Sequence, residues 1–449
     1  AAEMARHRVG SLLIHTDDDP EEIVGIITDR DLRTKVIAQG LDYSLPVERI
    51  MSSPVQRVLS RSICFDVLLK MMSTNIHHLA VERGDKIIGV ITSHDIMLQQ
   101  GHSPYYLFKE IITQSTIQGL YPLAQKIPDM IRNLIKEGGK AGNIASMIAV
   151  LNDYILERML TLLEEEMGRP PVPYCWLLLG SEGRREQTFR TDQDNAIIYA
   201  DPADEQQRQE AERYFSEFAR KAIDHLFNCG YPLCPGEIMA RNPRWCQPYS
   251  VWRGYFDRWI SAPDPEELLN VMIFFDFRCG FGDGSLAEDL RRHLIRATGR
   301  QEIYLMHLAK DCLAYRTPLS FFRTFIVEKD GEHKNTLDIK HQGITPFVNF
   351  ARVMALKHAV KETNTLARFR VLAEEGHISP GLEKAAAEAY ELQMQLRLVH
   401  QLYQIDNGHI PDNHINPANL TELEKRMLKD AFSVIERLQA VLKTLFPVV

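Results

Sequence analysis

No apolar run in this sequence reaches the roughly 20 residues that a helix needs to cross a bilayer. The N-terminus lacks the charged and then apolar pattern of a secretory signal peptide. No block of lysine and arginine occurs either, and the formal net charge is −8. Because nucleic acids and anionic membranes are bound through concentrated positive charge, we expect a cytoplasmic protein that binds neither nucleic acid nor membrane.

Cysteine is sparse and follows no metal-binding or disulfide pattern. The seven cysteines are scattered along the chain, and an odd count in a large chain fits reduced thiols better than a disulfide framework. Cys229, Cys234 and Cys246 contain no C-x-x-C pair and lack a well-spaced fourth ligand. A zinc site is therefore not expected.

The stretch from Trp176 to Tyr199 carries the clearest chemical signal. An apolar run stops at Gly180-Ser181, a polar segment follows, and Asp192-Gln193-Asp194 opens a second apolar run. This order predicts a strand, a turn that can cradle a phosphate, and a strand bearing two acids on one face. Small turn residues let backbone N–H groups approach an anion, and carboxylate oxygens suit Mg²⁺. The pattern predicts metal-assisted nucleotidyl transfer.

Two arginines, Arg184 and Arg185, follow the glycine-serine turn. Guanidinium groups form two-pronged hydrogen bonds with phosphate oxygens, so both arginines are candidates to bind a triphosphate. The alternative is an ion pair with Glu182 or Glu186. For the two aspartates a purely structural role is harder to justify, because neighbouring carboxylates repel unless a cation lies between them.

The string Gly180-Ser-Glu-Gly-Arg-Arg-Glu-Gln187, with Asp192-x-Asp194 after it, resembles the signature of the DNA polymerase beta-like nucleotidyltransferase superfamily. The resemblance is strong to the branch of PII uridylyltransferase and glutamine synthetase adenylyltransferase. It is strongest to bacterial nucleotidyltransferase-like proteins whose catalytic domain follows paired cystathionine-beta-synthase (CBS) domains, and it covers nearly the whole chain. It implies Mg²⁺ or Mn²⁺ held by the two aspartates and an NTP whose phosphates are bound by Gly180, Ser181, Arg184 and Arg185.

The first hundred residues contain an internal repeat. The string from Ile23 to Leu32 recurs from Ile87 to Ile96, about 64 positions later. In each copy a further strand precedes it, at Gly10 to His15 and at His78 to Glu82, and Thr and Asp mark the start of a helix. Residue 1 falls inside the expected first helix, so the first repeat is expected to be truncated at its N-terminus.

This repeat resembles a pair of CBS domains, a module that binds AMP, ADP or ATP and commonly dimerises. The resemblance implies a homodimer formed through the pair, and nucleotide contacts from Thr28, Asp31, Thr92 and Asp95. The alternative is that these side chains only cap their helices.

A helical connector follows the repeats. From Ser103 to Met167 apolar residues recur at three- and four-residue steps, with breaks at Gln118-Gly119 and Gly138-Gly139. About three helices are expected. They either relay the ligand state of the repeats or serve as a rigid spacer.

Beyond the two aspartates, an amphipathic helix is expected from Glu205 to Phe227 and a short strand from Ile238 to Ala240. In the superfamily a third acid on a following strand activates the attacking hydroxyl. Glu237 is the candidate for this catalytic role; the alternative is a turn residue that faces water.

The region after Pro263 is expected to be helical. Dense apolar periodicity marks Glu266 to Phe275, Leu286 to Tyr315, Phe347 to Val360, Glu383 to Ile405 and Leu420 to Phe446, and Thr421 with Glu424 predicts a capping box. Two polar segments interrupt this pattern. Either they border the active-site cleft or they form an internal salt-bridge network; their polar residues are Asp276, Arg278, Asp338 and Lys340.

We therefore predict a multidomain α/β and α protein with a CBS pair (1–101), a helical connector (102–171), a polymerase-beta-like nucleotidyltransferase domain (172–263) and a C-terminal helical, substrate-binding-like domain (264–449). The predicted activity is Mg²⁺-dependent transfer of a nucleoside monophosphate from an NTP to an unknown protein or small-molecule acceptor. Adenine nucleotides bound to the CBS pair would regulate it, in signal transduction. The alternatives are an adenine-nucleotide sensor with an inactive nucleotidyltransferase fold, or an interaction scaffold.

Overall fold

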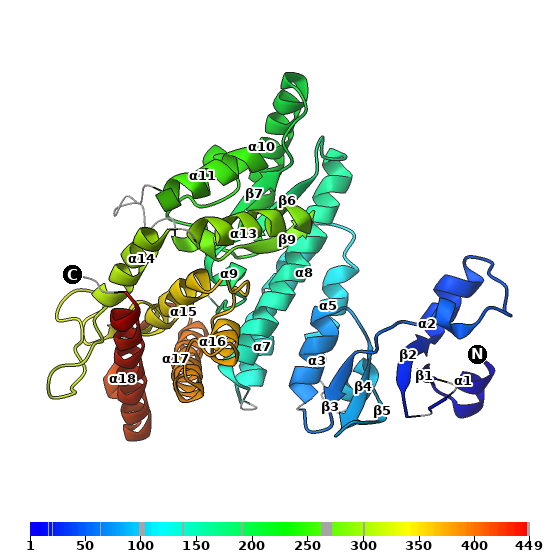
Figure 1. Ribbon diagram of the computed structural model, residues 1–449, viewed down its shortest axis with the longest axis horizontal. Helices are drawn as coiled ribbons and strands as arrows, with labels where there is room; N and C mark the ends of the chain where they lie inside the picture. Colours follow the sequence, from blue (N-terminus) through cyan, green and yellow to red (C-terminus); the bar gives the residue numbers. More distant parts are fainter. Residues whose placement is uncertain are drawn as a thin grey trace. The chain divides into compact units, whose positions relative to one another are not determined.

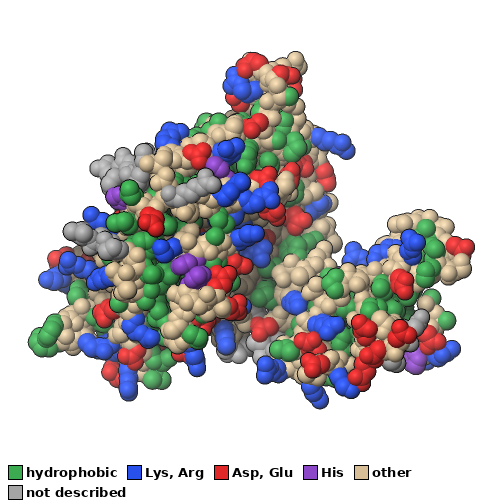
Figure 2. Space-filling view, in the orientation of Figure 1, with side chains coloured by type: hydrophobic (Ala, Val, Ile, Leu, Met, Phe, Trp, Pro, Cys, Tyr) green, Lys and Arg blue, Asp and Glu red, His purple; other side chains and the backbone are tan. Residues whose placement is uncertain are grey.

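The computed structural model describes residues 1–16, 18–19, 21–62, 64–97, 104–136, 139–189, 192–261, 272–299 and 301–446. Figure 1 shows the elements along the chain, which forms two compact units, Ala1–Phe108 and Lys109–Val449. Among the described residues, no helix has both the length and the apolar character that a membrane span requires. In Figure 2, acidic and basic side chains are interspersed over the face shown.

Unit 1 contains the two predicted repeats. In the first, β1 (Ser11–His15) pairs antiparallel with β2 (Ile23–Thr28). In the second, β4 (His78–Arg83) pairs antiparallel with β5 (Lys86–Thr92) and parallel with β3 (Arg57–Leu59). Ile26 of the first repeat packs in one core cluster with Ala80 of the second. The repeats therefore share a core, as expected when each unit cannot bury its apolar face alone.

The remaining elements of unit 1 are helical. They are α1 (Ala2–His7), α2 (Asp29–Asp31), η1 (Leu32–Ile37), η2 (Val47–Arg49), α3 (Cys64–Ser73) and α4 (Ser93–Met97). As predicted, α2 and α4 each follow the second strand of a repeat.

The connector is helical, as its periodicity predicts. It comprises α5 (Pro104–Ile112), η3 (Gln118–Leu120), α6 (Tyr121–Ala124), α7 (Ile127–Lys136) and α8 (Ala141–Met167). Helix α8 packs against α7, α10 (Glu205–Asn228), α17 (Pro380–Asp406) and strand β9 (Arg278–Gly282). It is therefore an integral part of unit 2, and its apolar residues are buried on most sides.

A four-stranded sheet lies within unit 2. It comprises β6 (Tyr174–Leu178), β7 (Asn195–Tyr199), β8 (Cys246–Pro248) and β9 (Arg278–Gly282), in the order β8-β7-β6-β9. Strand β6 runs antiparallel to β7 and β9, and β7 runs parallel to β8. Every residue of β6 and β7 is buried, since α10 (Glu205–Asn228), α13 (Gly284–Thr298) and α8 pack around the sheet.

Strand β9 lies beyond Pro263, in sequence that contains no strand pattern. Two glycines explain this, because a Cβ at Gly280 would lie 2.8 Å from Leu178 Cγ and one at Gly282 would lie 2.3 Å from the Tyr174 carbonyl oxygen. Glycine lets β9 approach β6 closely but removes the β-branched residues by which strands are predicted.

The C-terminal part is mainly helical, as predicted. After α11 (Tyr249–Ser261) and η5 (Met272–Phe275) it contains α14 (Glu302–Ala314), η6 (Ile339–Ile344), α15 (Thr345–Lys357), α16 (Thr365–Glu374), α17 (Pro380–Asp406) and α18 (Glu422–Leu445). The predicted capping box between Thr421 and Glu424 is confirmed. Strands β10 (Leu337–Asp338) and β11 (His414–Ile415) pair antiparallel.

One expected helix is described only at its end, and one expected strand is absent from the described residues. Most of the helix expected from Glu266 to Phe275 lies outside the described residues, and its end forms η5. The short strand expected from Ile238 to Ala240 does not form; that prediction was wrong. Glu237 takes a left-handed conformation (φ 53°), and a backbone that turns there does not continue as a strand.

Candidate active site

Asp192 and Asp194 lie just before β7, on an extended segment of the backbone. Gln193 between them is 2% exposed, and its N–H donates to the Pro232 carbonyl, whereas both aspartates are half-buried. Alternate side chains of an extended segment project to opposite sides, so the two carboxylates lie on the side away from Gln193. Among the described residues, neither carboxylate forms an ion pair with lysine or arginine.

The environment of Asp194 is crowded. Burial, together with the neighbouring charge of Asp192, raises the pKa of Asp194 to about 6, although the Cys234 thiol donates a hydrogen bond to it. The positive charges of Lys340 and Arg184 also act on Asp194, and burial outweighs them.

The glycine-serine turn lies against these acids. Gly180 and Ser181 open the short helix α9 (Gly180–Gly183), and the first N–H groups of a helix have no acceptor within it. Gly180 has φ +55°, and a Cβ there would lie 3.5 Å from Asp194 Oδ2 and 2.9 Å from Ile273 Cγ1. Glycine therefore allows the backbone of the turn to approach the Asp194 carboxylate.

Two positively charged side chains from the C-terminal helices lie near the aspartates. Lys340, on η6, is reached by solvent, yet its crowded surroundings partly desolvate it and lower its pKa. The charges of Asp194 and Asp192 oppose that shift, so all three lie near one another. Arg397, on α17, is buried, which lowers its pKa to about 10, and its Nε donates to Asn413 Oδ1 at 2.7 Å. Lys340 is among the residues expected at the cleft, whereas Arg397 is not.

Arg184 is held by acids. Its Nε lies 2.7 Å from Glu186 Oε2, and its Nη1 lies 2.8 Å from Asp276 Oδ2. The ion-pair alternative for this residue is therefore present in the structure. Arg185, at φ +57°, is half-exposed and lies 3.9 Å from Asp153. A phosphate contact for either arginine stays a prediction.

Asp276 is at the centre of an internal salt-bridge network. It is fully buried, and Arg352 and Arg368 contact its two carboxylate oxygens at 2.6 and 2.7 Å, in addition to Arg184. Although burial opposes ionisation, these three arginines hold the pKa of Asp276 well below its ordinary value. Asp276 therefore belongs to an internal salt-bridge network, which is one of the two roles expected for it; the other was a position at the border of the active-site cleft.

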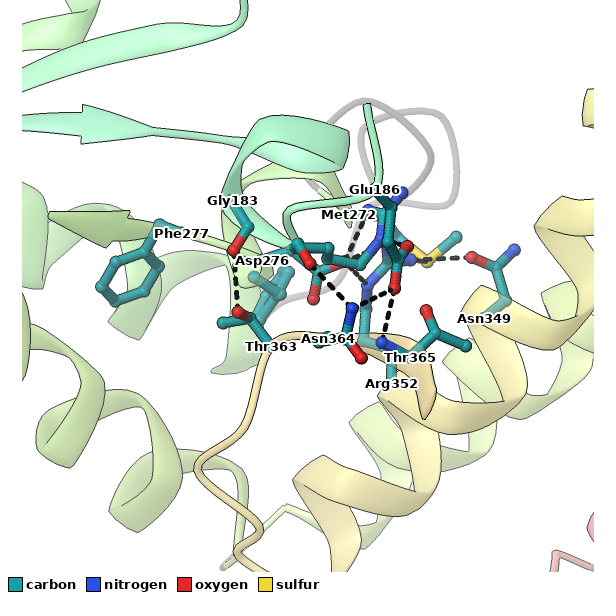
Figure 3. Close-up of polar contacts among 12 residues, drawn as sticks. Gly183, Glu186, Met272, Asp276, Phe277, Asn349, Arg352, Thr363, Asn364 and Thr365 are labelled. Carbon is teal, nitrogen blue, oxygen red and sulfur yellow. Dashed lines mark hydrogen bonds and ion pairs between the residues drawn. The ribbon is translucent and has the colours of Figure 1, made fainter. Parts of the chain in front are cut away.

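The loop before α16 binds the turn that carries Arg184 (Figure 3). Glu186 accepts hydrogen bonds from the Thr365 N–H at 2.5 Å and from Asn364 Nδ2 at 3.3 Å. Thr363 Oγ1 donates to the Gly183 carbonyl at 2.7 Å. These partners are some 180 residues apart in sequence, and no local pattern identifies them.

The other residues of the two polar segments have separate partners. Arg278 donates to Asp153 at 2.6 Å and to the Glu182 carbonyl at 3.0 Å. Asp338 accepts from the His341 N–H at 2.9 Å, capping η6. Both contacts are structural. A direct substrate contact for either residue stays a prediction.

Glu237 is not brought to the aspartate pair. Its side chain is 57% exposed and lies 3.0 Å from Arg241, in an open surface hollow that Arg213 and Arg241 also line. In the described part of the chain, no group of three or more His, Cys, Asp or Glu side chains could hold a metal ion. A third catalytic acid at Glu237 stays a prediction without support from its position.

In unit 1, each Thr–Asp pair forms a capping arrangement. Asp31 accepts from the Thr28 N–H at 3.0 Å and from its hydroxyl at 2.7 Å, while the Asp31 N–H donates to Thr28 Oγ1. Thr92 and Asp95 repeat this geometry. The capping alternative is therefore realised, and nucleotide contact stays a prediction.

The donor set of the acid pair fits a hard divalent cation. Two carboxylates give Mg²⁺ oxygen ligands, and Mg²⁺ usually takes its remaining ligands from water and substrate phosphates. Asp192 and Asp194 are the residues that would hold it.

This fold and site define a nucleotidyltransferase-type domain preceded by paired CBS domains. The family model described as "Putative nucleotidyltransferase DUF294" matches residues 125–266. The model described as "Putative nucleotidyltransferase substrate binding domain" matches residues 302–446, and the CBS-domain model matches residues 1–38 and 47–100. The predicted family and fold class are thereby confirmed.

Similarity to curated proteins covers part of the chain. CBS domain-containing protein CBSCBSPB1 of Arabidopsis thaliana is 35% identical over 89 residues, which are 20% of this chain and 16% of that protein. Uncharacterized protein MK0525 of Methanopyrus kandleri is 36% identical over 99 residues, which are 22% of this chain and 50% of that protein. The chain thus spans half or less of the length of these relatives.

Similar solved structures also cover part of the chain. An uncharacterized conserved protein from Pyrococcus horikoshii is 33% identical and covers 23% of this chain and 75% of its own, with a TM-score of 0.21. CBS domain protein PAE2072 from Pyrobaculum aerophilum, complexed with AMP, is 28% identical and covers 23% and 82%, also with a TM-score of 0.21. At these TM-scores the similarity supports no statement about the ligands of this chain.

Proposed function

We propose that the protein transfers a nucleoside monophosphate from an NTP to an acceptor at Asp192 and Asp194, in a reaction that requires Mg²⁺ or Mn²⁺. One observation supports this above all. The Asp194 carboxylate lies beside the Gly180 turn, the charge of Asp192 acts on it, and neither acid forms an ion pair with lysine or arginine in the described residues. Acids that only stabilised the fold would be expected to have such partners.

The residues around the pair have separate roles in this proposal. When bound, the divalent ion would offset the charge that develops on the transferred phosphate. The N–H groups of Gly180 and Ser181 donate to the phosphate oxygens. Lys340 and Arg397 supply positive charge near the acids. The acceptor hydroxyl, on a protein or a small molecule, attacks the α-phosphorus in line and loses its proton to solvent, while the bond from the α-phosphorus to the β-phosphate oxygen breaks and pyrophosphate leaves.

The test is transfer of label from each of the four α-³²P-labelled NTPs to a cell extract or its fractions. We expect a labelled product with wild-type protein and Mg²⁺, and none with EDTA. Asp192→Asn and Asp194→Asn should each lower the rate by at least about 10²-fold, since each removes charge at the reacting phosphate. The matched control is Asp224→Asn, which changes an exposed acid on α10 and should leave the rate unchanged.

The same assay examines Glu237. Because its side chain lies in a surface hollow that neither Asp192 nor Asp194 lines, Glu237→Gln is expected to keep the rate within about 2-fold of wild type. A loss of 10²-fold or more would identify it as the third acid after all. Label that persists in both aspartate variants would contradict the proposed site.

A second candidate function is a sensor that binds adenine nucleotides but has lost turnover. The absence of a third acid beside the pair in the described residues favours it. Binding of AMP or ATP with no labelled product from any NTP or extract fraction would support the sensor over the enzyme.

We further propose that the CBS pair binds an adenine nucleotide, regulates the catalytic unit in signal transduction and forms a homodimer. The Thr28–Asp31 and Thr92–Asp95 pairs support nucleotide binding, because both place a hydroxyl and a carboxylate at the end of a β-strand in the same geometry. The molar mass in solution tests the dimer, and the rate of label transfer with and without AMP tests the regulation.

A double variant separates nucleotide binding from capping. Thr28→Ala/Thr92→Ala should weaken AMP or ATP binding by at least about 10-fold in calorimetry, from the loss of two hydroxyl contacts. Loss of the caps alone costs about 1 kcal/mol each. Thr421→Ala removes the equivalent capping box of α18 and should leave binding unchanged. Equal binding by all three proteins would show that the CBS threonines only cap.

A further inference from the structure

Two adjacent residues of helix α8, Asn152 and Asp153, are linked to both parts of the candidate active site. Each reaches its part of the site through one intermediate side chain. Both residues are half-buried, and both precede the nucleotidyltransferase signature in the sequence. The tertiary structure, and not the motif, brings them to the site.

Asn152 supports the segment that carries the two aspartates. Its Oδ1 accepts a hydrogen bond from the Tyr231 hydroxyl at 2.7 Å. The Tyr231 carbonyl accepts from Gln193 Nε2 at 2.9 Å, and the Pro232 carbonyl accepts from the Gln193 N–H at 2.9 Å. Gln193 is buried and lies between the two aspartates in sequence. These bonds therefore hold the backbone from which both carboxylates project.

Asp153 supports the turn at Gly180–Gly183. Its Oδ1 accepts from Arg278 Nη2 at 2.6 Å, and Arg278 Nε donates to the Glu182 carbonyl, inside the turn, at 3.0 Å. Its Oδ2 lies 3.9 Å from Nη2 of Arg185, which follows the turn. One carboxylate of α8 is thus the shared counter-ion of an arginine on β9 and an arginine of the signature.

We propose that Asn152 and Asp153 are positioning residues, of which Asn152 holds the metal-binding segment and Asp153 holds the phosphate-binding turn. The inference rests on the proposed function, which assigns the metal to the two aspartates and the phosphates to the turn. Small displacements of such groups are costly, because metal affinity and phosphate binding both depend on the exact placement of the contacting atoms. Helix α8 suits this role, since its apolar residues are buried on most sides.

Binding of Mn²⁺ alone tests the role of Asn152. Tyr231→Phe removes the hydroxyl that donates to Asn152 but keeps the ring and the carbonyl. It should weaken Mn²⁺ binding by at least about 10-fold in calorimetry, as the loss of an outer contact does at other metal sites. Asn152→Leu removes the same bond from the side of α8 and should give the same loss. The matched control is Tyr174→Phe, whose hydroxyl donates to Glu164 of the same helix at 2.7 Å and should keep wild-type binding.

Binding of the α,β-methylene analogues of the NTPs in saturating Mn²⁺ tests the role of Asp153. These analogues cannot release pyrophosphate, so binding is measured without turnover. Asp153→Asn leaves two arginines without their counter-ion and should weaken the tightest analogue by at least about 10-fold. Arg278→Lys keeps the charge but not the two-pronged geometry, and it covers the case in which Asp153→Asn does not fold. The matched control is Glu166→Gln, which changes an exposed acid of α8 that pairs with Lys221 at 2.8 Å.

The two measurements distinguish positioning from a general loss of structure. Tyr231→Phe should keep analogue binding, and Asp153→Asn should keep Mn²⁺ binding, each within about 3-fold of wild type. Loss of both kinds of binding in both variants, or of neither, would overturn the inference while leaving the proposed function in place. Wild-type protein that binds neither Mn²⁺ nor any analogue would contradict the proposed function, and this inference with it.

Discussion

Replacing Asp276 by asparagine is expected to lower the free energy of unfolding by about 3–5 kcal/mol, which is a large fraction of the stability of a typical domain. The carboxylate is fully buried and contacts Arg184, Arg352 and Arg368 at 2.6–2.8 Å. An amide carries no charge, so the substitution leaves three arginines without their shared counter-ion. Breaking a buried ion network by removing one member costs far more than the network contributes on balance.

The dependence of this effect on pH follows from the direction of the pKa shift. The three arginines hold the pKa of Asp276 below its ordinary value, so its contribution to stability is present above the unfolded-state pKa, near 4. It is lost only as the pH falls through the lower folded-state pKa. The difference between wild type and Asp276→Asn should therefore be constant from about pH 5 to 8 and shrink in strong acid.

Urea unfolding at several pH values measures both the size and the pH dependence. The matched control is Asp257→Asn, whose partially exposed carboxylate pairs with His293 at 2.7 Å and should contribute no more than about 1 kcal/mol. If Asp276→Asn were as stable as this control, the network would not stabilise the fold.

Gly183→Ala is expected to destabilise the protein by at least about 3 kcal/mol or to prevent folding. A Cβ at this position would lie 1.9 Å from the Asp276 carbonyl oxygen and 2.9 Å from the Leu178 carbonyl oxygen. Both are backbone atoms, which cannot rotate away as a side chain can. The methyl group would force the turn at Gly180–Gly183 away from the backbone of Asp276 and disturb the salt-bridge network.

A second glycine-to-alanine variant provides the comparison. Gly254 lies inside α11, and a Cβ there would meet nothing within 4 Å. Gly254→Ala should therefore be neutral or stabilising by about 0.5–1 kcal/mol, because alanine favours helix. Chemical denaturation of both variants measures the difference. If Gly183→Ala and Gly254→Ala were equally stable, the turn at Gly183 would accommodate a Cβ, contrary to the distances given above.

Local sequence patterns predict much of this fold. The repeat, the buried strands β6 and β7, the amphipathic helices and the capping box of α18 all follow from periodicity and from residue types at helix ends. Strand β9 does not, since its glycines serve a close approach to β6 that depends on another part of the chain. Local sequence carries no information about such a partner.

The candidate site divides in the same way. The aspartate pair and the glycine turn are adjacent in sequence, and a short motif identifies them. Asp276, which pairs with Arg184, and the buried Arg397 lie far along the chain, and only the fold brings them to the site. The position of Glu237 depends on a left-handed backbone turn rather than on its distance in sequence from the aspartates. Motifs therefore predict the acids, and only the tertiary structure shows which charges surround them.

The contacts of Glu186 with Asn364 and Thr365 have a practical consequence for dissecting the protein. A shortened polypeptide that ends before residue 302 would keep the aspartates and the glycine turn but lose Arg352, Arg368 and the loop that binds Glu186. The two aspartates would also lose the positive charges of Lys340 and Arg397, which lie near them in the full chain. If such a shortened piece were inactive or aggregated, the cause would be the loss of these C-terminal contacts. The result would therefore not test whether the aspartates are catalytic.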